Sequence, residues 1–301
     1  MSQIVAASPH VTTKNSTAVI MRDVLIALLP AVIAGCVVFG LRALLVVAVT
    51  TAACVFFEWG FEKLCHTPST ISDLSAAVTG VLLAMNLPVS IPLWQAVFGA
   101  LVAMVAVKGL FGGIGKNFAN PAITARIVMF LAFSKTMTAW VFPDAVSTAT
   151  PLAMMASGES VDYLTLLLGN HGGCLGETSA LALLIGFAYL LIRGVISWHT
   201  PVCFVGTVFV MSLILGQDAV GQILSGGLML GAIFMATDYS TTPSTNLGRV
   251  LFGIGAGLLT VLIRFYGAYA EGVSFAILFM NILTPYLSKW TETKPFGGAA
   301  A

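Results

Sequence analysis

Residues 24–39 read VLIALLPAVIAGCVVF, an apolar run without a single charged side chain. A membrane-spanning helix needs about 20 mostly apolar residues, and the extended stretch 22–41 supplies that length. No A-x-A cleavage site follows the run, so it does not have the pattern of a cleaved signal peptide. The run therefore predicts an uncleaved first transmembrane helix.

The rest of the chain has the composition of a membrane protein. Of its 301 residues, 58% are hydrophobic and 8% are charged, and the mean hydropathy is +0.99. Soluble domains carry about 25% charged residues, so a soluble globule of this length would lack the charges to cover its surface. The formal net charge of +1 also excludes a nucleic-acid-binding protein, which would show a clustered basic face.

Ten stretches have the hydropathy of membrane spans. Seven are clear, at 22–41, 43–61, 91–111, 179–197, 200–216, 249–267 and 273–289. Three more are short or interrupted, at 73–87, 118–134 and 221–237. Broken helices of this kind occur where the loosened backbone is buried in protein or lines a cavity. We expect an all-α polytopic membrane protein with about ten transmembrane helices.

The two halves of the chain also resemble each other. The Leu-Ser pair at 74–75 and Met85 recur at 224–225 and Met235 with a constant offset. Coincidence among apolar segments of low complexity is the alternative explanation. An odd number of spans per copy requires an inverted second copy, and inverted repeats with broken helices are typical of transporters. The prediction is two inverted five-helix repeats, an arrangement that resembles urea transporters.

Lysine and arginine are distributed unevenly over the ends of these spans. With the N-terminus inside, most basic residues fall at inner ends, whereas the outer ends receive Arg42, Lys135 and Arg264. The positive-inside rule then places both termini in the cytoplasm. The predicted organisation has cytoplasmic tails at 1–21 and 291–301, membrane repeats at 22–134 and 179–290, and an extracytoplasmic loop at 135–178.

No metal site is expected from the cysteines and histidines. The five cysteines are scattered without a C-x-x-C pair, and most lie in or beside apolar stretches, as small buried side chains do. His171, Cys174 and Glu177 stand in the glycine-rich segment HGGCLGE, but three unlike ligands on such a loop give weak support for zinc. We expect neither a metal ion nor an iron–sulfur cluster held by this chain alone.

The predicted outer loop contains the segment DAVSTATP at 144–151. By composition it is an ordinary loop of small residues and hydroxyls, in which the proline keeps Thr150 extended. The segment resembles the motif on which a flavin transferase attaches FMN, through a phosphoester, to the final threonine in the D subunit of the Rnf complex and in the B subunit of the sodium-translocating NADH:quinone oxidoreductase. The resemblance implies that Thr150 is the attachment point and that Asp144, Ser147 and Ala149 complete the attachment motif.

Two further segments carry the same resemblance. KNFANPA at 116–122 resembles the family's Asn-x-Phe-Asn-Pro-Ala stretch, and ATDYSTTP at 236–243 resembles its Thr-Asp-x-x-Thr-x-Pro stretch. The likeness therefore runs from the first span to the last. Because the chain lacks the long N-terminal extension expected of the quinone-reductase subunit, the resemblance favours the Rnf subunit.

This resemblance implies a subunit of an ion-translocating complex in the bacterial cytoplasmic membrane. The subunit, not catalytic alone, would relay electrons through covalent FMN between ferredoxin and NAD⁺ with coupled Na⁺ or H⁺ movement. A second, non-covalent flavin such as riboflavin is left open. The implied partners are the other Rnf subunits (A, B, C, E and G), above all the FMN-bearing extracytoplasmic G subunit, together with a flavin transferase and membrane lipid. The alternatives are the B subunit of the quinone reductase and a urea-transporter-like solute channel without redox function.

Asp238 lies where an apolar span meets the predicted cytoplasmic side. An ionisable residue at membrane depth is a functional candidate. Asp238, with Thr237 and Asn120, is therefore a candidate for the ion path or for the second flavin site. The alternative is a helix-terminal carboxylate in water, or the N-cap of the helix that follows.

Three other carboxylates are interpreted as structural. Asp73 is expected to cap the third span. Glu58 and Glu62 lie four residues apart on the second span. Because exposed ion pairs contribute little, we interpret these two as a solvated or Lys63-paired helix end rather than as ion ligands.

Overall fold

The computed structural model describes residues 16–140, 150–169, 171–267 and 272–292. In this part of the chain all regular elements are helical, apart from one isolated bridge between Pro88 and Cys174. The all-α prediction is confirmed for these residues.

The helices of the first half follow the predicted spans. They are α1 (Thr17–Phe39), α2 (Leu41–Leu64), the 3₁₀ turn η1 (Ile71–Asp73), α3 (Ser75–Met85), α4 (Leu93–Leu101) with its π-helical continuation η2 (Val102–Gly109), α5 (Pro121–Ala132) and α6 (Ser134–Met137). Gly40 joins α1 to α2 with a φ of 71°, a left-handed conformation that favours glycine. The chain can therefore reverse direction between two long helices through a single residue.

The second half contains more helix breaks. Its elements are α7 (Pro151–Ala156), α8 (Tyr163–Leu168), α9 (Ala180–Ile192), α10 (His199–Ile214), α11 (Ala219–Leu224), α12 (Leu228–Leu230) with its π-helical continuation η3 (Gly231–Met235), α13 (Asn246–Tyr266) and α14 (Val273–Trp290). Gly226 and Gly227 adopt φ values of 68° and 66°, which end α11 and start α12. The predicted stretch 221–237 is thus an interrupted helix.

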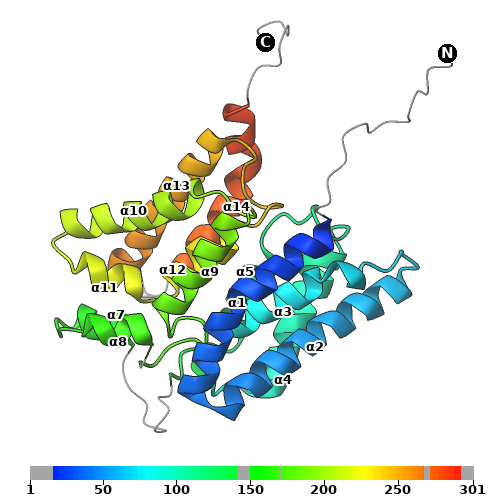
Figure 1. The fold of residues 1–301 in the computed structure, drawn as a ribbon, viewed down its shortest axis with the longest axis horizontal. Coiled ribbons are helices and arrows are strands. Elements are labelled where there is room, and N and C mark those ends of the chain that lie inside the picture. The colour runs from blue at the N-terminus through cyan, green and yellow to red at the C-terminus, as the bar shows by residue number, and fades with distance from the viewer. Residues whose placement is uncertain (1–15, 141–149, 170, 268–271, 293–301) are drawn as a thin grey trace, which may run out of the picture.

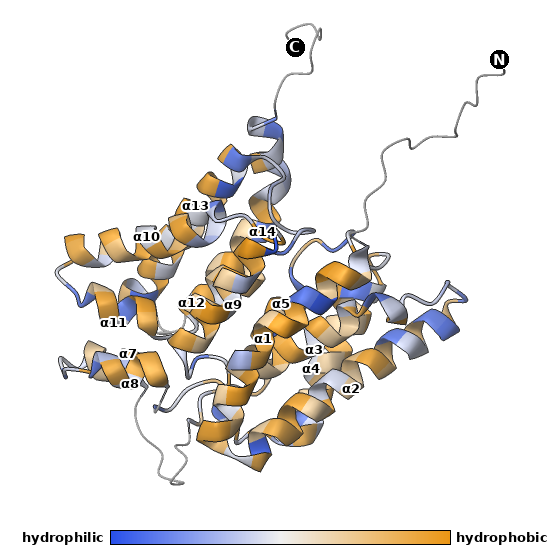
Figure 2. Cartoon of the chain, in the orientation of Figure 1, coloured by the Kyte–Doolittle hydropathy of each residue, from blue (hydrophilic) through white to orange (hydrophobic). Residues whose placement is uncertain are grey.

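Among the described residues three helices, α1, α2 and α13, are long and apolar enough to cross a membrane. Five shorter apolar helices accompany them. Apolar colour covers much of the helix surfaces, while hydrophilic positions gather towards helix ends (Figure 2). On α1 the exposed fraction is 52% at Leu29, 59% at Ile33 and 79% at Val37. Such an outward apolar face is stable in lipid and costly in water, so the protein is an integral membrane protein.

The helices form two groups with matching contacts (Figure 1). In the first group α2 packs against α3 and α4, and in the second α10 packs against α11 and α13. The groups meet where α1 contacts α9 and where α5 contacts α14. The candidate site lies at this boundary, which α1 and α5 form on one side and α9 and α14 form on the other.

Candidate functional site

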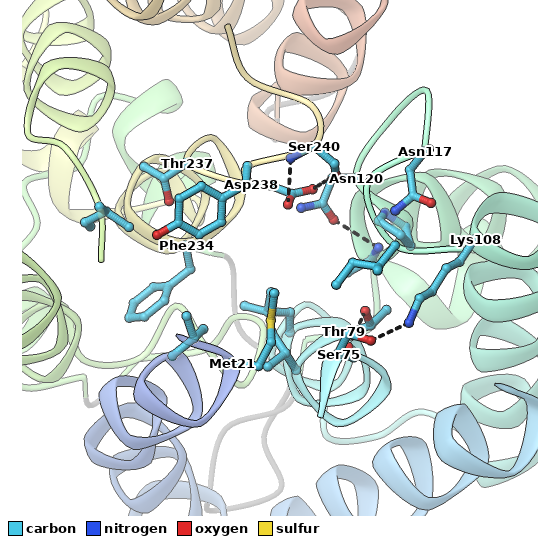
Figure 3. Close-up of a pocket in the computed structure, with 18 of the residues that line it drawn as sticks. Met21, Ser75, Thr79, Lys108, Asn117, Asn120, Phe234, Thr237, Asp238 and Ser240 are labelled. Carbon is cyan, nitrogen blue, oxygen red and sulfur yellow. Dashed lines mark hydrogen bonds between the residues drawn. The ribbon is translucent and has the colours of Figure 1, made fainter. Parts of the chain in front are cut away.

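A cavity of about 80 Å³ opens between the two groups of helices. Its walls come from the beginning of α1, the start of α3, the end of η2, the start of α5 and residues 234–240. Asn120, Thr237 and Asp238 all line it (Figure 3). Residues that are far apart in the sequence therefore share one cavity, together with the ammonium-bearing side chain of Lys108.

Asp238 lies in the loop that follows η3. Its carboxylate accepts hydrogen bonds from the Ser240 backbone nitrogen at 3.5 Å, the Ser240 hydroxyl at 3.1 Å and the Thr241 hydroxyl at 3.2 Å. Burial raises the pKa of Asp238 above its ordinary value, against the opposing effect of these hydrogen bonds. The N-cap of α13 is Thr245. The alternative interpretation of Asp238 as the cap of the following helix is therefore wrong.

Asn120 ties the start of α5 to the second group of helices. Its Oδ1 accepts from the backbone nitrogens of Ala122 and Ile123 at 3.0 and 3.3 Å, which caps α5. Its Nδ2 donates to the carbonyl oxygen of Met235 at 3.4 Å. In the amide orientation that suits both neighbours, Asn281 accepts from the Asn120 backbone nitrogen at 3.1 Å. Asn120 thus joins the first group of helices to the second by hydrogen bonds at the wall of the cavity.

The size and lining of this cavity limit what it can hold. Its lining supplies carboxylate, hydroxyl and amide oxygens, which are ligands suited to hard cations. A cavity of about 150 Å³ accommodates one benzene ring, so about 80 Å³ is too small for the three fused rings of a flavin. Of the two sequence-based candidates for Asp238, the geometry favours a small hydrated ion.

A buried charged cluster beside this cavity is the feature that sequence reasoning missed. Glu58, Glu62 and Lys108 are 6%, 8% and 4% exposed. Lys108 Nζ forms an ion pair with Glu58 Oε1 and donates to Ser75 Oγ at 2.5 Å. Lys63 instead lies over the Trp59 ring, 5.0 Å from its centroid. The interpretation of these glutamates as a solvated or Lys63-paired helix end is therefore wrong.

A signal for this cluster was present in the sequence. Glu58 and Glu62 share one helix face at the i, i+4 spacing, and Lys108 is the one charged residue of the stretch 91–111. When one cationic and two acidic side chains lie in apolar stretches, they are expected to pair with each other. The fold was needed to show that Lys108 pairs with Glu58. The N-cap residue of α3 is Leu74 and not the expected Asp73, although Asp73 Oδ1 accepts from the nitrogen of Ser75, the first residue of α3, at 2.7 Å.

Thr150 begins α7, with Pro151 in the first helical position. Its backbone is extended (φ −66°, ψ 155°), and its Oγ1 accepts from the Ala153 nitrogen at 3.3 Å. The residue is half-buried. The other members of the attachment motif, Asp144, Ser147 and Ala149, lie outside the described residues.

Arg126 of α5 forms the centre of a second buried polar cluster. Its Nη1 donates to Asn86 Oδ1 and Ser274 Oγ at 3.0 Å each, and its Nη2 lies 3.4 Å from Cys174 Sγ and 3.9 Å from Glu177 Oε1. Cys174 and Glu177 belong to the glycine-rich segment, which is buried where the structure describes it. Cys174 and Glu177 therefore act as partners of the Arg126 guanidinium, which links α3, α5 and α14.

Apolar lipid-facing helices, interrupted helices and a polar cavity between two groups define a polytopic class of integral membrane protein. The chain belongs to the NQR2, RnfD, RnfE family, whose model matches residues 4–297. The family resemblance carried by the three sequence motifs is confirmed.

Relatives of similar length match almost the whole chain. The D subunit of the Na(+)-translocating ferredoxin:NAD(+) oxidoreductase complex of Acetobacterium woodii is 46% identical over 301 residues, covering 97% of this chain and 95% of that protein. The D subunit of the proton-translocating ferredoxin:NAD(+) oxidoreductase complex of Clostridium ljungdahlii is 38% identical, covering 97% and 96%. The D subunit of the ion-translocating oxidoreductase complex of Halorhodospira halophila is 34% identical, covering 99% and 96%.

Proposed function

We propose that this chain is the membrane-embedded D subunit of an ion-translocating ferredoxin:NAD⁺ oxidoreductase complex and that it carries FMN esterified to Thr150. The names of the relatives from Acetobacterium woodii and Clostridium ljungdahlii support the assignment of the complex. The observation that carries the flavin assignment is a threonine hydroxyl at the start of α7, at the end of the acceptor-like segment. The proposal includes the bacterial cytoplasmic membrane, the other Rnf subunits and a flavin transferase as its setting and partners.

The surroundings of Thr150 suit a phosphoester. Its extended backbone and the following Pro151 present the hydroxyl at a helix start, and the Ala153 amide already donates to Oγ1. A phosphate oxygen at this position would be a stronger acceptor than the neutral hydroxyl, because charge-assisted hydrogen bonds are the stronger kind. When bound, the flavin would supply one-electron chemistry, and the chain would hold it in place.

The attachment point and the ion cavity lie at opposite ends of α13. Thr245, in the loop that follows Asp238, caps the start of this helix. Arg264 in its last turn donates to the carbonyl oxygens of Ser225 and Gly226, and Leu152 of α7 lies against Gly226. A helix of 21 residues is about 30 Å long. The proposal therefore assigns flavin attachment and ion entry to opposite membrane faces.

The proposed ion path passes through the cavity lined by Asp238, Thr237 and Asn120. Asp238 supplies a carboxylate at the cavity wall, and the small volume argues against the second, non-covalent flavin at this place. We expect Asp238→Asn to reduce Na⁺- or H⁺-coupled transport by the complex in vesicles while leaving covalent flavin attached. Unchanged coupling in that variant would assign Asp238 a structural role.

The proposed topology has ten membrane-crossing segments in two inverted repeats, with both termini in the cytoplasm. The matching contacts of α2 with α3 and α4, and of α10 with α11 and α13, support the repeat. A single cysteine introduced at the exposed Gly158 should react with an impermeant maleimide from the outer face. Labelling from the cytoplasmic face alone would contradict the orientation.

The test of the flavin assignment compares two variants of Thr150. Thr150→Ala removes the ester-forming oxygen, so the denatured polypeptide should lose its fluorescence under ultraviolet light in a gel while membrane insertion persists. Thr150→Ser retains a hydroxyl and should keep part of the label. Ser157→Ala, which removes an exposed hydroxyl at the other end of α7, is the matched control and should label fully.

Mass spectrometry of the peptide covering 136–193 identifies the modified residue. FMN-sized mass on Thr150 supports the proposal, and the same mass on Ser147 or Thr148 contradicts the assignment. A chain that carries no flavin when made with an active transferase would favour the solute-channel alternative.

A further inference from the structure

A second cavity, of about 290 Å³, lies between α2, the end of η2 and the segment that leads into η1. Its polar lining comes from Glu58, Glu62, Thr67, Thr70 and Lys108. Thr67 and Thr70 are exposed, so the cavity lies next to the surface. Lys108 also lines the cavity that contains Asp238, so the two cavities share a wall.

Each of the two glutamates in this cavity has one bonded and one unbonded oxygen. Glu62 Oε1 accepts from the Thr70 nitrogen at 2.9 Å and from the Thr70 hydroxyl at 2.5 Å. Glu58 Oε1 receives the Lys108 ammonium and lies 3.4 Å from the Thr70 hydroxyl. Oε2 of Glu58 and Oε2 of Glu62 are buried without a hydrogen-bond partner among the described residues. Both residues are more than nine-tenths buried.

The charges of this cluster do not balance. Two buried carboxylates face one ammonium in this cavity, whereas the half-buried Asp73, which accepts from the nitrogen and the hydroxyl of Ser75, does not line it. A buried charge without a counter-charge is strongly unfavourable. Hydrogen bonds from Thr70 help to satisfy Glu62 but bring no positive charge. One more unit of positive charge is required at the two unbonded oxygens.

We infer that Glu58 and Glu62 form a binding site for one monovalent cation, either Na⁺ or a proton. Lys108 neutralises Glu58, and the bound cation neutralises Glu62, with Thr70 holding the second carboxylate in position. Two carboxylates and one ammonium do not supply the charge for a divalent ion, and the described residues contain no group of three His, Cys, Asp or Glu suited to a metal ion.

This inference deepens the proposed function and rests on it only for the purpose of the site. If the chain belongs to an ion-translocating complex, the site would hold the ion next to the Asp238 cavity. The experiment below measures cation occupancy by chemical labelling, whereas the flavin assignment is tested by fluorescence at Thr150. A negative result in the labelling experiment therefore does not affect the interpretation of the fluorescence experiment, and the reverse also holds.

The test is labelling of the assembled complex in membranes with dicyclohexylcarbodiimide, a reagent that modifies protonated carboxyl groups in apolar surroundings. Cleavage after Arg42 and Lys63 releases the peptide 43–63, which contains both glutamates. Without Na⁺ at acid pH, we expect a label on Glu62. For a sodium site, NaCl at about ten times its Kd should lower the labelling roughly tenfold, and equal KCl should not.

The outcomes separate the two cations. Protection by Na⁺ identifies a sodium site, whereas labelling that falls with rising pH and ignores Na⁺ identifies a proton site. An unlabelled peptide 43–63 at acid pH, or labelling that is independent of both pH and Na⁺, would overturn the inference.

Two variants distinguish a binding role from a structural one. Glu62→Gln keeps an oxygen that accepts from Thr70 but removes the charge, so labelling of the peptide should disappear because Glu58 remains in its ion pair with Lys108. Lys108→Met removes the ammonium, so both Glu58 and Glu62 should become labelled. Glu159→Gln, at an exposed glutamate, is the matched control and should change neither pattern. Persistent labelling of Glu58 in Glu62→Gln would contradict the assigned roles.

Discussion

Replacing Gly186 by alanine tests the contact that joins the two groups of helices. Gly186 lies in α9, and a Cβ at this position would come closer to the Ala27 carbonyl oxygen of α1 than real Cβ atoms do. The same Cβ would lie 2.9 Å from Cζ of Phe234. Because the first obstacle is backbone of a long helix, α1 and α9 must move apart to admit the methyl group.

The expected change in the free energy of unfolding is the sum of two opposing contributions. Alanine is favoured over glycine in a helix by about 0.5–1 kcal/mol, whereas overpacking a filled interface costs about 1–3 kcal/mol. At Gly206 in α10, an added methyl group would have no neighbouring atom within 4 Å. Gly206→Ala therefore measures the helix propensity of alanine without any overpacking. We expect Gly206→Ala to stabilise the protein slightly and Gly186→Ala to destabilise it by about 1–2 kcal/mol.

The assay is the apparent Tm of the purified protein in detergent, followed by the loss of the monodisperse peak in size-exclusion chromatography. At about 2–4 °C per kcal/mol, the two alanine variants should differ by several degrees. Equal Tm values for Gly186→Ala and Gly206→Ala would refute the close packing of α1 on α9.

Two further predictions concern the charges of Asp238, which is half-buried, and of Glu177, which is buried. Asp238 has a raised pKa, so the folded protein binds this proton more tightly than the unfolded chain, and stability falls as the pH rises from about 4 through the raised pKa. Asp238→Asn should therefore have a higher Tm than the parent at neutral pH, and the difference should shrink towards pH 4 in a pH series of melting curves; a constant difference would contradict this. Arg126→Met should destabilise the protein by about 3–5 kcal/mol, because it leaves Glu177 buried without its partner. Adding Glu177→Gln should recover part of the lost Tm, and strictly additive effects would show that the two side chains are not coupled.

The class of protein and the positions of its irregular helices could be predicted from sequence. The three stretches predicted to be short or interrupted, 73–87, 118–134 and 221–237, contain the short helices α3 and α5 and the break between α11 and α12. These features depend on local properties, namely the length of an apolar run and the positions of glycine and proline. Local properties are present in the sequence without knowledge of the partner helix.

The candidate site was predictable in part. Asn120, Thr237 and Asp238 were identified from motifs in two distant segments, and the structure adds that they line a common cavity. The third motif ends at Thr150, whose extended backbone follows from the proline after it.

What the tertiary structure decided is which charges are buried and which partners they meet. A glutamate at the end of an apolar helix has the same sequence signature whether water or protein covers it. Glu58 and Glu62 are buried because Thr70, from the following segment, and Lys108, from the end of η2, fold over the end of α2. Arg126 likewise reaches Asn86, Ser274 and Cys174 only when three helices and the glycine-rich segment converge. Burial and pairing depend on contacts between distant segments, and an ionisable side chain acquires its charge balance from those contacts and not from its neighbours in sequence.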